Sequence, residues 1–339
     1  MGKLSATAGL ALAVSSVATA GQLAATQDAT EVTEAARAPD PGPNFTVLHA
    51  FDAAAGDIPE SITTDRDGNL YISVGKTIRR RSVDGTLSVF ATLPLEIFSL
   101  GLKVGSDGCV YNVSTSLTDV PGAFVWRVCE ADQVEQFAEL DQSGGPNDLA
   151  FDRQGDLYVT DPRLGRVWKI DSEGQPSVWL EDALLTGDPA SPALVFSPLG
   201  VNGIAFQADG RTLLLSNTDR GTILRARPRG NQSPALSVFV EDVRLRGADG
   251  IALDRRGTLF VNVNATDTFA SVSPAGSLRI LAQGGLLDAP SSVVFGATEQ
   301  DRFQMYVSSS AFSRTFGLQV GDPHPALLVT PVQAPGLPL

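Results

Sequence analysis

The chain has 339 residues, of which 43% are hydrophobic and 19% are charged, and this composition is ordinary for a globular protein with a sizeable core. Its formal net charge is −13, and so acidic a surface would repel phosphate backbones and anionic lipids. We therefore expect no nucleic-acid and no membrane partner. The partner that we expect is a small-molecule substrate, bound by a monomer.

The first 20 residues have the pattern of an export signal. Lys3 precedes the short apolar stretch TAGLALAVSSVATA, and Ala18-Thr19-Ala20 fits the small-x-small cleavage pattern. The alternative interpretation is a disordered N-terminus rich in Ala and Ser. Residues 21–43 are rich in Ala, Glu and Pro without periodicity, as is typical of a disordered linker. The folded domain is thus predicted to span residues 44–339 of a secreted or periplasmic protein.

Most of the remaining chain repeats one pattern, in which a short apolar run, an Asp/Gly turn and a second apolar run follow one another. Five copies keep the same spacing around the turn glycine: ESITTDRDGNLYIS, LGLKVGSDGCVYNV, NDLAFDRQGDLYVT, NGIAFQADGRTLLLS and DGIALDRRGTLFVN. The sixth copy, SSVVFGATEQDRFQMYVS, has a longer turn. Each turn closes a hairpin, and further strand-like runs such as RVWKID and PSVWLED follow it. Six four-stranded antiparallel sheets are therefore predicted, which together make an all-β, six-bladed β-propeller.

Two segments are candidates for the outer strand of the last blade. FTVLHAFD, which starts at Phe45, has the outer-strand pattern and precedes the first blade. We predict that it joins the last blade and closes the ring, whereas PALLVTPV near the C-terminus is the alternative for the same place.

The first residues of the six copies form a ring, because the innermost strand of each propeller blade runs along the central channel. These residues are Glu60, Leu100, Asn147, Asn202, Asp249 and Ser291. Two facing carboxylates in a dry channel repel each other unless a cation lies between them. Carboxylate and amide oxygens without a thiol or imidazole suit Ca²⁺, with Mg²⁺ or Mn²⁺ as alternatives. Taken singly, Asn147 and Asn202 could be ordinary turn residues, and Glu60 could be a solvated loop charge.

With these motifs, the chain resembles the senescence marker protein/gluconolactonase family of six-bladed propellers, which includes diisopropylfluorophosphatase. The resemblance extends from Phe45 to about residue 331. It implies that Glu60, Asn147, Asn202 and Asp249 are the metal ligands. It also implies hydrolysis of a small cyclic ester or a related electrophile, in which the cation polarises the carbonyl group.

Asp249 is our candidate catalytic residue, either as the base that activates water or, alternatively, as a direct nucleophile. Ser291 and three residues that follow second strands, Asp161, Asn217 and Asn264, are candidate substrate contacts. For the latter three, turn formation by the Asx side chain is the alternative.

We therefore predict a secreted, calcium-dependent hydrolase of a small lactone or related ester. The alternatives are a non-hydrolytic propeller enzyme, such as a strictosidine-synthase-like enzyme or a cyclase, and a non-catalytic secreted binding propeller. The sequence contains no Gly-x-Ser-x-Gly motif, and its two histidines, His49 on an outer strand and His324 in a Pro-rich tail, do not favour a histidine mechanism. The stretch LLTGDPASPALVFSP has little charge, which favours a less polar ligand than an open sugar acid.

Cys109 and Cys129 are the only two cysteines, and they flank a predicted hairpin. If Ser114 faces Phe124 in that hairpin, the antiparallel register places Cys109 opposite Cys129. A disulfide is then geometrically feasible and would fit an exported protein. Two buried reduced thiols are the alternative.

Overall fold

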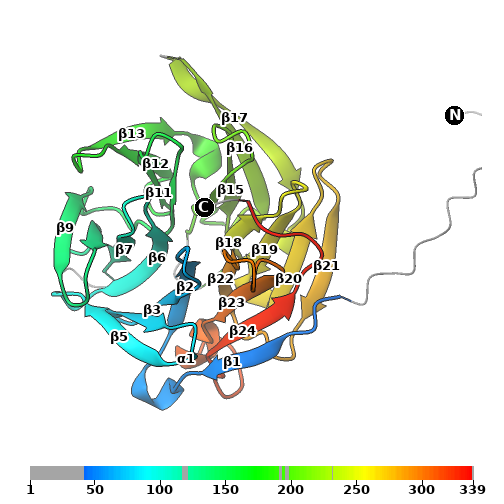
Figure 1. Ribbon diagram of the computed structural model, residues 1–339. Coiled ribbons are helices and arrows are strands. Elements are labelled where there is room, and N and C mark those ends of the chain that lie inside the picture. The colour runs from blue at the N-terminus through cyan, green and yellow to red at the C-terminus, as the bar shows by residue number, and fades with distance from the viewer. Residues whose placement is uncertain (1–41, 117–120, 191–192, 195–197, 231, 338–339) are drawn as a thin grey trace, which may run out of the picture. The chain divides into compact units, whose positions relative to one another are not determined.

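The computed structural model describes residues 42–116, 121–190, 193–194, 198–230 and 232–337. The predicted signal peptide, and all of the predicted linker except its last two residues, lie outside these ranges. The unit from Gly42 to Leu339 contains six four-stranded sheets arranged in a ring (Figure 1). The predicted six-bladed β-propeller is therefore confirmed.

The first three blades use their strands in chain order from the channel outwards. Blade 1 contains β2 (Pro59–Thr64), β3 (Leu70–Val74), β4 (Thr77–Arg81) and β5 (Leu87–Thr92). Blade 2 contains β6 (Phe98–Val104), β7 (Val110–Thr115), β8 (Phe124–Val128) and β9 (Val134–Glu139). Blade 3 contains β10 (Leu149–Phe151), β11 (Leu157–Asp161), β12 (Arg166–Ile170) and β13 (Pro176–Glu181).

Blades 4 and 5 follow the same order. Blade 4 contains β14 (Val201–Phe206), β15 (Leu213–Asn217), β16 (Thr222–Arg229) and β17 (Gln232–Glu241). Blade 5 contains β18 (Ala248–Leu253), β19 (Leu259–Val263), β20 (Thr268–Val272) and β21 (Leu278–Gln283). The helices of the described residues are short: η1 (Ala53–Ala55), η2 (Ala183–Leu185), η3 (Val243–Leu245), η4 (Asn264–Thr266) and α1 (Phe312–Thr315). None of them has the length and apolar character that a membrane span requires.

Blade 6 combines strands from both ends of the described chain. Its order is β22 (Pro290–Phe295), β23 (Gln304–Ser309), β24 (Ala326–Pro331) and β1 (Thr46–Ala50). The segment PALLVTPV thus supplies the third strand, β24. The segment FTVLHAFD supplies β1, which pairs antiparallel with β24 at the outer edge of the sheet.

The hairpin turns of four blades share one side-chain contact. Each of the four tyrosines in the sequence lies on a second strand and donates its hydroxyl hydrogen to a turn aspartate, at 3.0 to 3.3 Å. The pairs are Tyr71 with Asp65, Tyr111 with Asp107, Tyr158 with Asp152, and Tyr306 with Asp301. Burial, followed by the neighbouring aspartate, raises the pKa of Tyr111 to about 12. These tyrosines stay protonated and tie each second strand to its turn.

The hairpin of β7 and β8 has the register that the sequence predicts, because Ser114 pairs with Phe124. Cys109 and Cys129 lie just beyond the paired residues and form a disulfide bond, with their Cα atoms 4.1 Å apart. This bond joins the second strand of blade 2 to the turn that follows its third strand.

Glycines allow the innermost strands of neighbouring blades to approach closely. A Cβ atom added at Gly101, Gly203 or Gly250 would lie 2.4 to 2.6 Å from a backbone carbonyl oxygen of the next blade. Those oxygens belong to Asn147, Asp249 and Ser291. A larger residue would therefore push adjacent blades apart, since the opposing atoms belong to the backbone.

Replacing Gly250 by alanine tests this packing. We expect the free energy of unfolding to fall by about 1–3 kcal/mol, because the new methyl group overlaps the Ser291 carbonyl group. Denaturant unfolding measures the change. Gly145→Ala is the matched control, because its added Cβ would meet only the Arg163 side chain, 3.3 Å away. Equal stability of the two variants would show that the close approach does not constrain the fold.

Candidate functional site

A cavity of about 450 Å³ lies where the innermost strands begin. Its lining includes all four predicted metal ligands and one predicted substrate contact. These residues are Glu60, Asn147, Asn202, Asp249 and Asn264. Residues that are far apart in the sequence, from blades 1, 3, 4 and 5, thus meet at one mouth of the channel.

Local irregularities of the innermost strands turn these side chains towards the channel. In β2, β14 and β18, the regular register is interrupted at the ligand position, so that two residues oppose one on the second strand. Such bulges change the direction in which a side chain points, and they occur often next to active sites. In blade 3, Asn147 lies just before β10, where its N–H donates to the Thr160 carbonyl group.

Hydroxyl groups on the second strands connect these irregular positions from blade to blade. The Ser216 Oγ accepts a hydrogen bond from the Gly203 N–H at 2.7 Å and donates to the Asp249 carbonyl group at 2.8 Å. The Ser308 Oγ likewise accepts from the Ser292 N–H and donates to the Glu60 carbonyl group. These buried bonds fix the backbone of the candidate ligands.

Two of the amide side chains that line the cavity have oxygen atoms without a partner among the described residues. Asn202 donates its Nδ2 hydrogen to Thr218 Oγ1 at 3.0 Å, and its buried Oδ1 is left without a hydrogen bond. Asn264 donates from Nδ2 to Asp249 Oδ2 at 3.3 Å, and its Oδ1 is also unsatisfied. Because buried polar atoms are rarely left unpaired, these oxygens indicate a missing partner of positive character.

The carboxyl groups of the cavity repel one another. Burial, and after it the charge of Asp148, raises the pKa of Glu60 to about 8. The pKa of Asp249 is raised well above its usual value by burial, by Glu60 and by Asp148. A bound cation would remove this repulsion. Two carboxylates together with amide oxygens are the donor set that Ca²⁺ prefers, so Glu60, Asn147, Asn202 and Asp249 fit such an ion.

Three predicted substrate contacts do not line this cavity. The Asp161 carboxylate accepts hydrogen bonds from the N–H groups of Gly145 and Leu164 and from the Trp168 indole. Asn217 donates to the carbonyl groups of Leu184 and Thr186. These contacts are those of the turn-forming alternative.

Ser291 is the third predicted substrate contact that does not line the cavity. It is buried and donates a hydrogen bond to the Glu60 carbonyl group at 2.6 Å. It therefore braces the backbone of a candidate ligand, instead of facing the cavity.

The sequence analysis missed Asp148, which follows Asn147. Its carboxylate accepts hydrogen bonds from the backbone N–H of Leu149 and from that of Ile204 in the next blade. A signal was present, because blades 2, 4 and 5 have glycine at the equivalent position and blade 3 has an aspartate. The hydroxyls of Ser216 and Ser308 also occupy a repeated position, because Ser73 and Thr160 are at the equivalent place on the second strands of blades 1 and 3.

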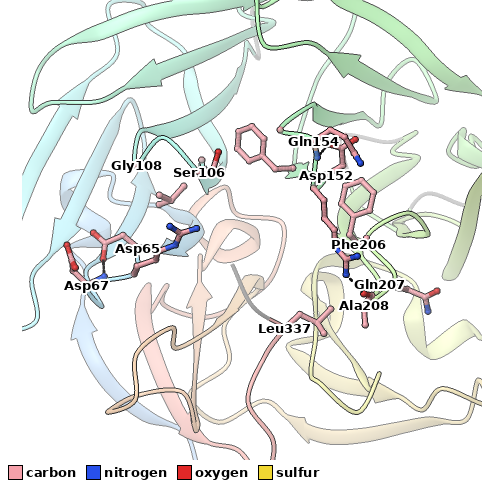
Figure 2. A pocket seen from close by; sticks show the side chains of 17 residues that line it. Asp65, Asp67, Ser106, Gly108, Asp152, Gln154, Phe206, Gln207, Ala208 and Leu337 are labelled. Carbon is pink, nitrogen blue, oxygen red and sulfur yellow. Dashed lines mark hydrogen bonds between the residues drawn. The ribbon is translucent and has the colours of Figure 1, made fainter.

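A larger cavity, of about 770 Å³, lies at the hairpin turns that end the innermost strands (Figure 2). The first strands run from the candidate ligands to these turns, so this cavity is at the opposite end of the channel. Its Asp65 and Asp152 side chains accept hydrogen bonds from the backbone N–H groups of their own turns. They therefore stabilise turns, and the larger cavity gathers none of the predicted site residues.

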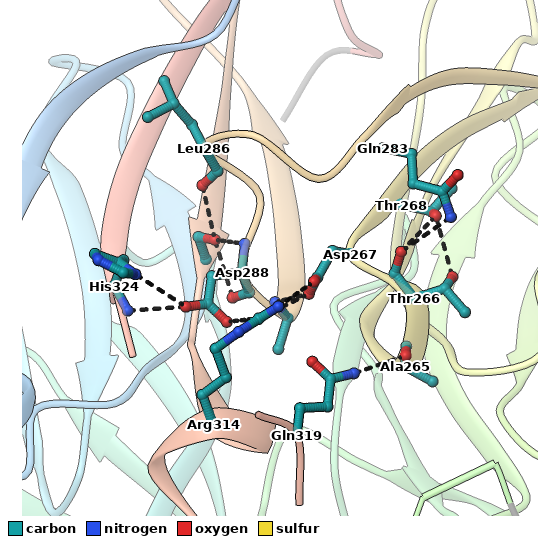
Figure 3. Close-up of polar contacts among 12 residues, drawn as sticks. Ala265, Thr266, Asp267, Thr268, Gln283, Leu286, Asp288, Arg314, Gln319 and His324 are labelled. Carbon is teal, nitrogen blue, oxygen red and sulfur yellow. Dashed lines mark hydrogen bonds and ion pairs between the residues drawn. The ribbon is translucent and has the colours of Figure 1, made fainter. Parts of the chain in front are cut away.

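A salt-bridge network joins the segment that follows β23 to two loop aspartates (Figure 3). Arg314 forms ion pairs with Asp267 and Asp288, and the His324 N–H donates to Asp288. Ser310 and Phe312 of this segment line the cavity.

Three non-glycine residues with left-handed backbone lie around this network: Asp267 at φ 50°, Ala289 at φ 48° and Ala311 at φ 52°. Such strain persists only where the surroundings enforce it, and it is common near functional sites.

The fold and the site define a β-propeller whose channel mouth gathers oxygen donors around a small cavity. The sequence profile described as the SMP-30/gluconolactonase/LRE-like region matches residues 58–311. The chain therefore belongs to the SMP-30/gluconolactonase/LRE-like family. A search of curated protein sequences gave no match.

Solved structures with the same fold have low sequence identity to this chain. A gluconolactonase from Xanthomonas campestris is 17% identical, with a TM-score of 0.61, over 86% of this chain and 90% of that chain. Regucalcin from Agrobacterium tumefaciens, named as a calcium-binding protein, is 16% identical with a TM-score of 0.61, over 88% and 95% of the two chains. Virginiamycin B lyase from Staphylococcus aureus is 16% identical with a TM-score of 0.56, over 78% and 85%. At these identities the likeness establishes the fold alone.

The raised pKa values of Glu60 and Asp249 predict a pH-dependent stability that a cation removes. Because the pKa of Glu60 is raised from 4.5 to about 8, its carboxyl group stabilises the fold fully below pH 4.5 and loses this contribution as the pH rises through 8. The raised pKa of Asp249 acts in the same direction. With a chelator present, we expect the melting temperature to fall by at least about 5 °C between about pH 5 and pH 8. Millimolar Ca²⁺ should largely abolish the fall, as should Glu60→Gln in chelator. An identical pH dependence with chelator and with Ca²⁺ would contradict the cation site.

Proposed function

We propose that this protein is an exported, calcium-dependent hydrolase of a small lactone or related ester. The observation that carries the proposal is the convergence of Glu60, Asn147, Asn202 and Asp249 on one cavity of about 450 Å³. Membership of the SMP-30/gluconolactonase/LRE-like family supports it. The gluconolactonase from Xanthomonas campestris has the same fold and is a named member of this reaction class.

The four residues that would hold the cation are Glu60, Asn147, Asn202 and Asp249. When bound, the cation would polarise the substrate carbonyl group and stabilise the negative charge that develops on its oxygen. The protein contributes the fixed geometry. Ser216 and Ser308 hold the backbone carbonyl groups of Asp249 and Glu60, so the donors need no rearrangement when the substrate arrives.

Asp249 is the residue that we propose for proton transfer. The hydrogen bond from Asn264 Nδ2 orients its carboxylate in the cavity. In the hydrolysis, a water oxygen bonds to the carbonyl carbon and gives a proton to Asp249, the ring C–O bond breaks, and the leaving oxygen takes the proton back. If Asp249 instead attacks the carbonyl carbon, the ring C–O bond breaks as a mixed anhydride forms. Water that then attacks the Asp249 carboxyl carbon gives its proton to the ring oxygen and leaves one of the Asp249 oxygens in the product of the first turnover. A single turnover in isotopically labelled water distinguishes the two routes.

Export is supported by the N-terminal sequence pattern and by the disulfide between Cys109 and Cys129. Disulfides persist mainly in oxidising compartments outside the cytosol. We therefore propose a periplasmic or extracellular site of action, in which Ca²⁺ is also available to the channel mouth.

Substitution of two ligands tests the proposed function. We expect Asp249→Ala to reduce kcat/KM for a hydrolysed lactone by about 10²- to 10⁴-fold through loss of the base. Asn202→Ala should weaken Ca²⁺ affinity by more than roughly 10- to 100-fold. That range is the loss expected when a residue that only orients a metal ligand is removed. Calorimetric Ca²⁺ titration and a lactone and ester panel, with and without chelator, provide the measurements.

The matched control is Asp84→Ala, because Asp84 is an exposed turn aspartate on blade 1. All variants should keep the far-ultraviolet circular dichroism of the parent protein. Mass analysis of the product separates hydrolysis, which adds one water, from an elimination or cyclisation. Wild-type turnover in both ligand variants, or full activity in chelator, would show that the assignment is wrong.

A further inference from the structure

The cavity at the channel mouth has an apolar wall beside its oxygen donors. Besides the four candidate ligands, its lining includes side chains that carry no hydrogen-bonding group: Ile58, Phe98, Leu100, Pro162, Leu199 and Phe312. A ligand whose reacting oxygen meets the donors would therefore place the rest of its surface against hydrocarbon.

The sequence positions of these residues explain why they lie beside the donors. Ile58 precedes Glu60 by two residues, and Phe98 precedes Leu100 by two residues. Both members of each pair line the cavity, although a bulge lies at the ring position of each strand. Blades 1 and 2 thus each present an apolar side chain next to their ring position.

Leu100 itself occupies a ring position that in blades 1, 3, 4 and 5 carries an oxygen donor. Its side chain is half-buried and lines the cavity. The ring is therefore apolar at blade 2, between the donors Glu60 and Asn147. The Leu100 side chain cannot form a hydrogen bond. A ligand group that packs against it therefore binds more tightly when it is apolar.

The polar side chains beyond the four ligands are few and partly committed to the protein. Ser310 Oγ donates to the Ala289 carbonyl group at 2.8 Å, and Arg163 Nη1 donates to the Gly144 carbonyl group at 2.9 Å. The buried hydroxyl oxygens of Ser99 and Thr115, like Asn264 Oδ1, have no hydrogen-bond partner among the described residues. The side chains of Phe98, Leu100 and Phe312 offer no hydrogen bond, so hydroxyl groups that a sugar ring turns towards them would stay unpaired.

We propose that the substrate is an alkyl- or aryl-substituted lactone or ester, whose apolar substituent packs against Phe98, Leu100 and Phe312, and that polyhydroxylated sugar lactones are poor substrates. This inference rests on the proposed hydrolase function and narrows its substrate class. Each hydroxyl left unpaired against this wall carries a desolvation cost, whereas each methylene that leaves water is stabilised.

A lactone series measures this preference directly. We expect kcat/KM of the Ca²⁺-loaded protein to rise about 3- to 4-fold for each methylene added to a 5-alkyl δ-lactone, until the cavity is filled. Glucono-δ-lactone should be hydrolysed more slowly than the unsubstituted δ-lactone. Equal or faster hydrolysis of glucono-δ-lactone, or no dependence on alkyl length, would overturn the proposal.

Variants of the wall assign the effect to these side chains. Leu100→Asn and Phe312→Ser should each reduce kcat/KM for the hexyl-substituted lactone at least about 10-fold relative to the unsubstituted lactone. Val243→Ser is the control, because Val243 is 75% exposed on η3 and does not line the cavity. Circular dichroism and Ca²⁺ affinity will show whether either variant has a folding defect. Because there are two variants, a defect in one leaves the other to test the wall. If both fold and keep the wild-type chain-length preference, the wall is not the determinant.

A binding experiment tests this inference independently of the hydrolase function. Cyclopentanones with the same alkyl substituents have a carbonyl group but no ester bond, so they cannot be hydrolysed. Calorimetry should show affinities that increase with alkyl length and weaken in the Leu100→Asn variant. Such binding without hydrolysis of any lactone would overturn the hydrolase function and leave the apolar ligand class standing. Ketone affinities that are independent of alkyl length would overturn the ligand class.

Discussion

The close approach of the innermost strands is the constraint on which the rest of the structure depends. At three junctions between blades only glycine leaves room for the neighbouring backbone: Gly101, Gly203 and Gly250. Between blades 4 and 5, the Ser216 hydroxyl bonds to both sides of such a junction. Neighbouring strands are thus held by backbone contacts and by buried hydrogen bonds, neither of which tolerates a small displacement. This packing therefore fixes the volume of the cavity that the residues at the channel mouth line.

This rigidity has an electrostatic consequence. Glu60 and Asp249 face the same cavity, and Asp148 adds a third negative charge nearby. The carboxylates cannot move apart, because their backbones are fixed by the neighbouring blades. Their repulsion is relieved only by proton uptake or by a cation. The free energy of binding of the proposed cation would therefore be linked to that of folding, because these carboxylates come together only in the folded chain.

The sequence was sufficient for the fold and for the convergence of the ring, because both follow from local spacing. The turn glycine fixes the register of the first hairpin in blades 1 to 5, and residues at equivalent positions of a cyclic repeat must face one axis. The loop residues could not be assigned in this way. Asp161, Asn217 and Asn264 all follow second strands, but only Asn264 lines the cavity. Asp161 and Asn217 instead bond to backbone groups of neighbouring loops, which differ in length from blade to blade and leave no trace in the repeat.

The candidate ligands and the apolar side chains of the cavity come from different blades of the repeat. Three of the four candidate ligands come from blades 3, 4 and 5, where the repeat supplies an amide or a carboxylate. Phe98, Leu100 and Phe312 come from blades 2 and 6, on either side of the blade of Glu60. A substrate of the proposed class would meet oxygen donors from blades 1, 3, 4 and 5 and hydrocarbon from blades 2 and 6, and this uneven lining would fix its orientation before any bond changes. Because the packing of the innermost strands fixes the donors, the apolar side chains are the part of the site that can vary without disturbing the ring.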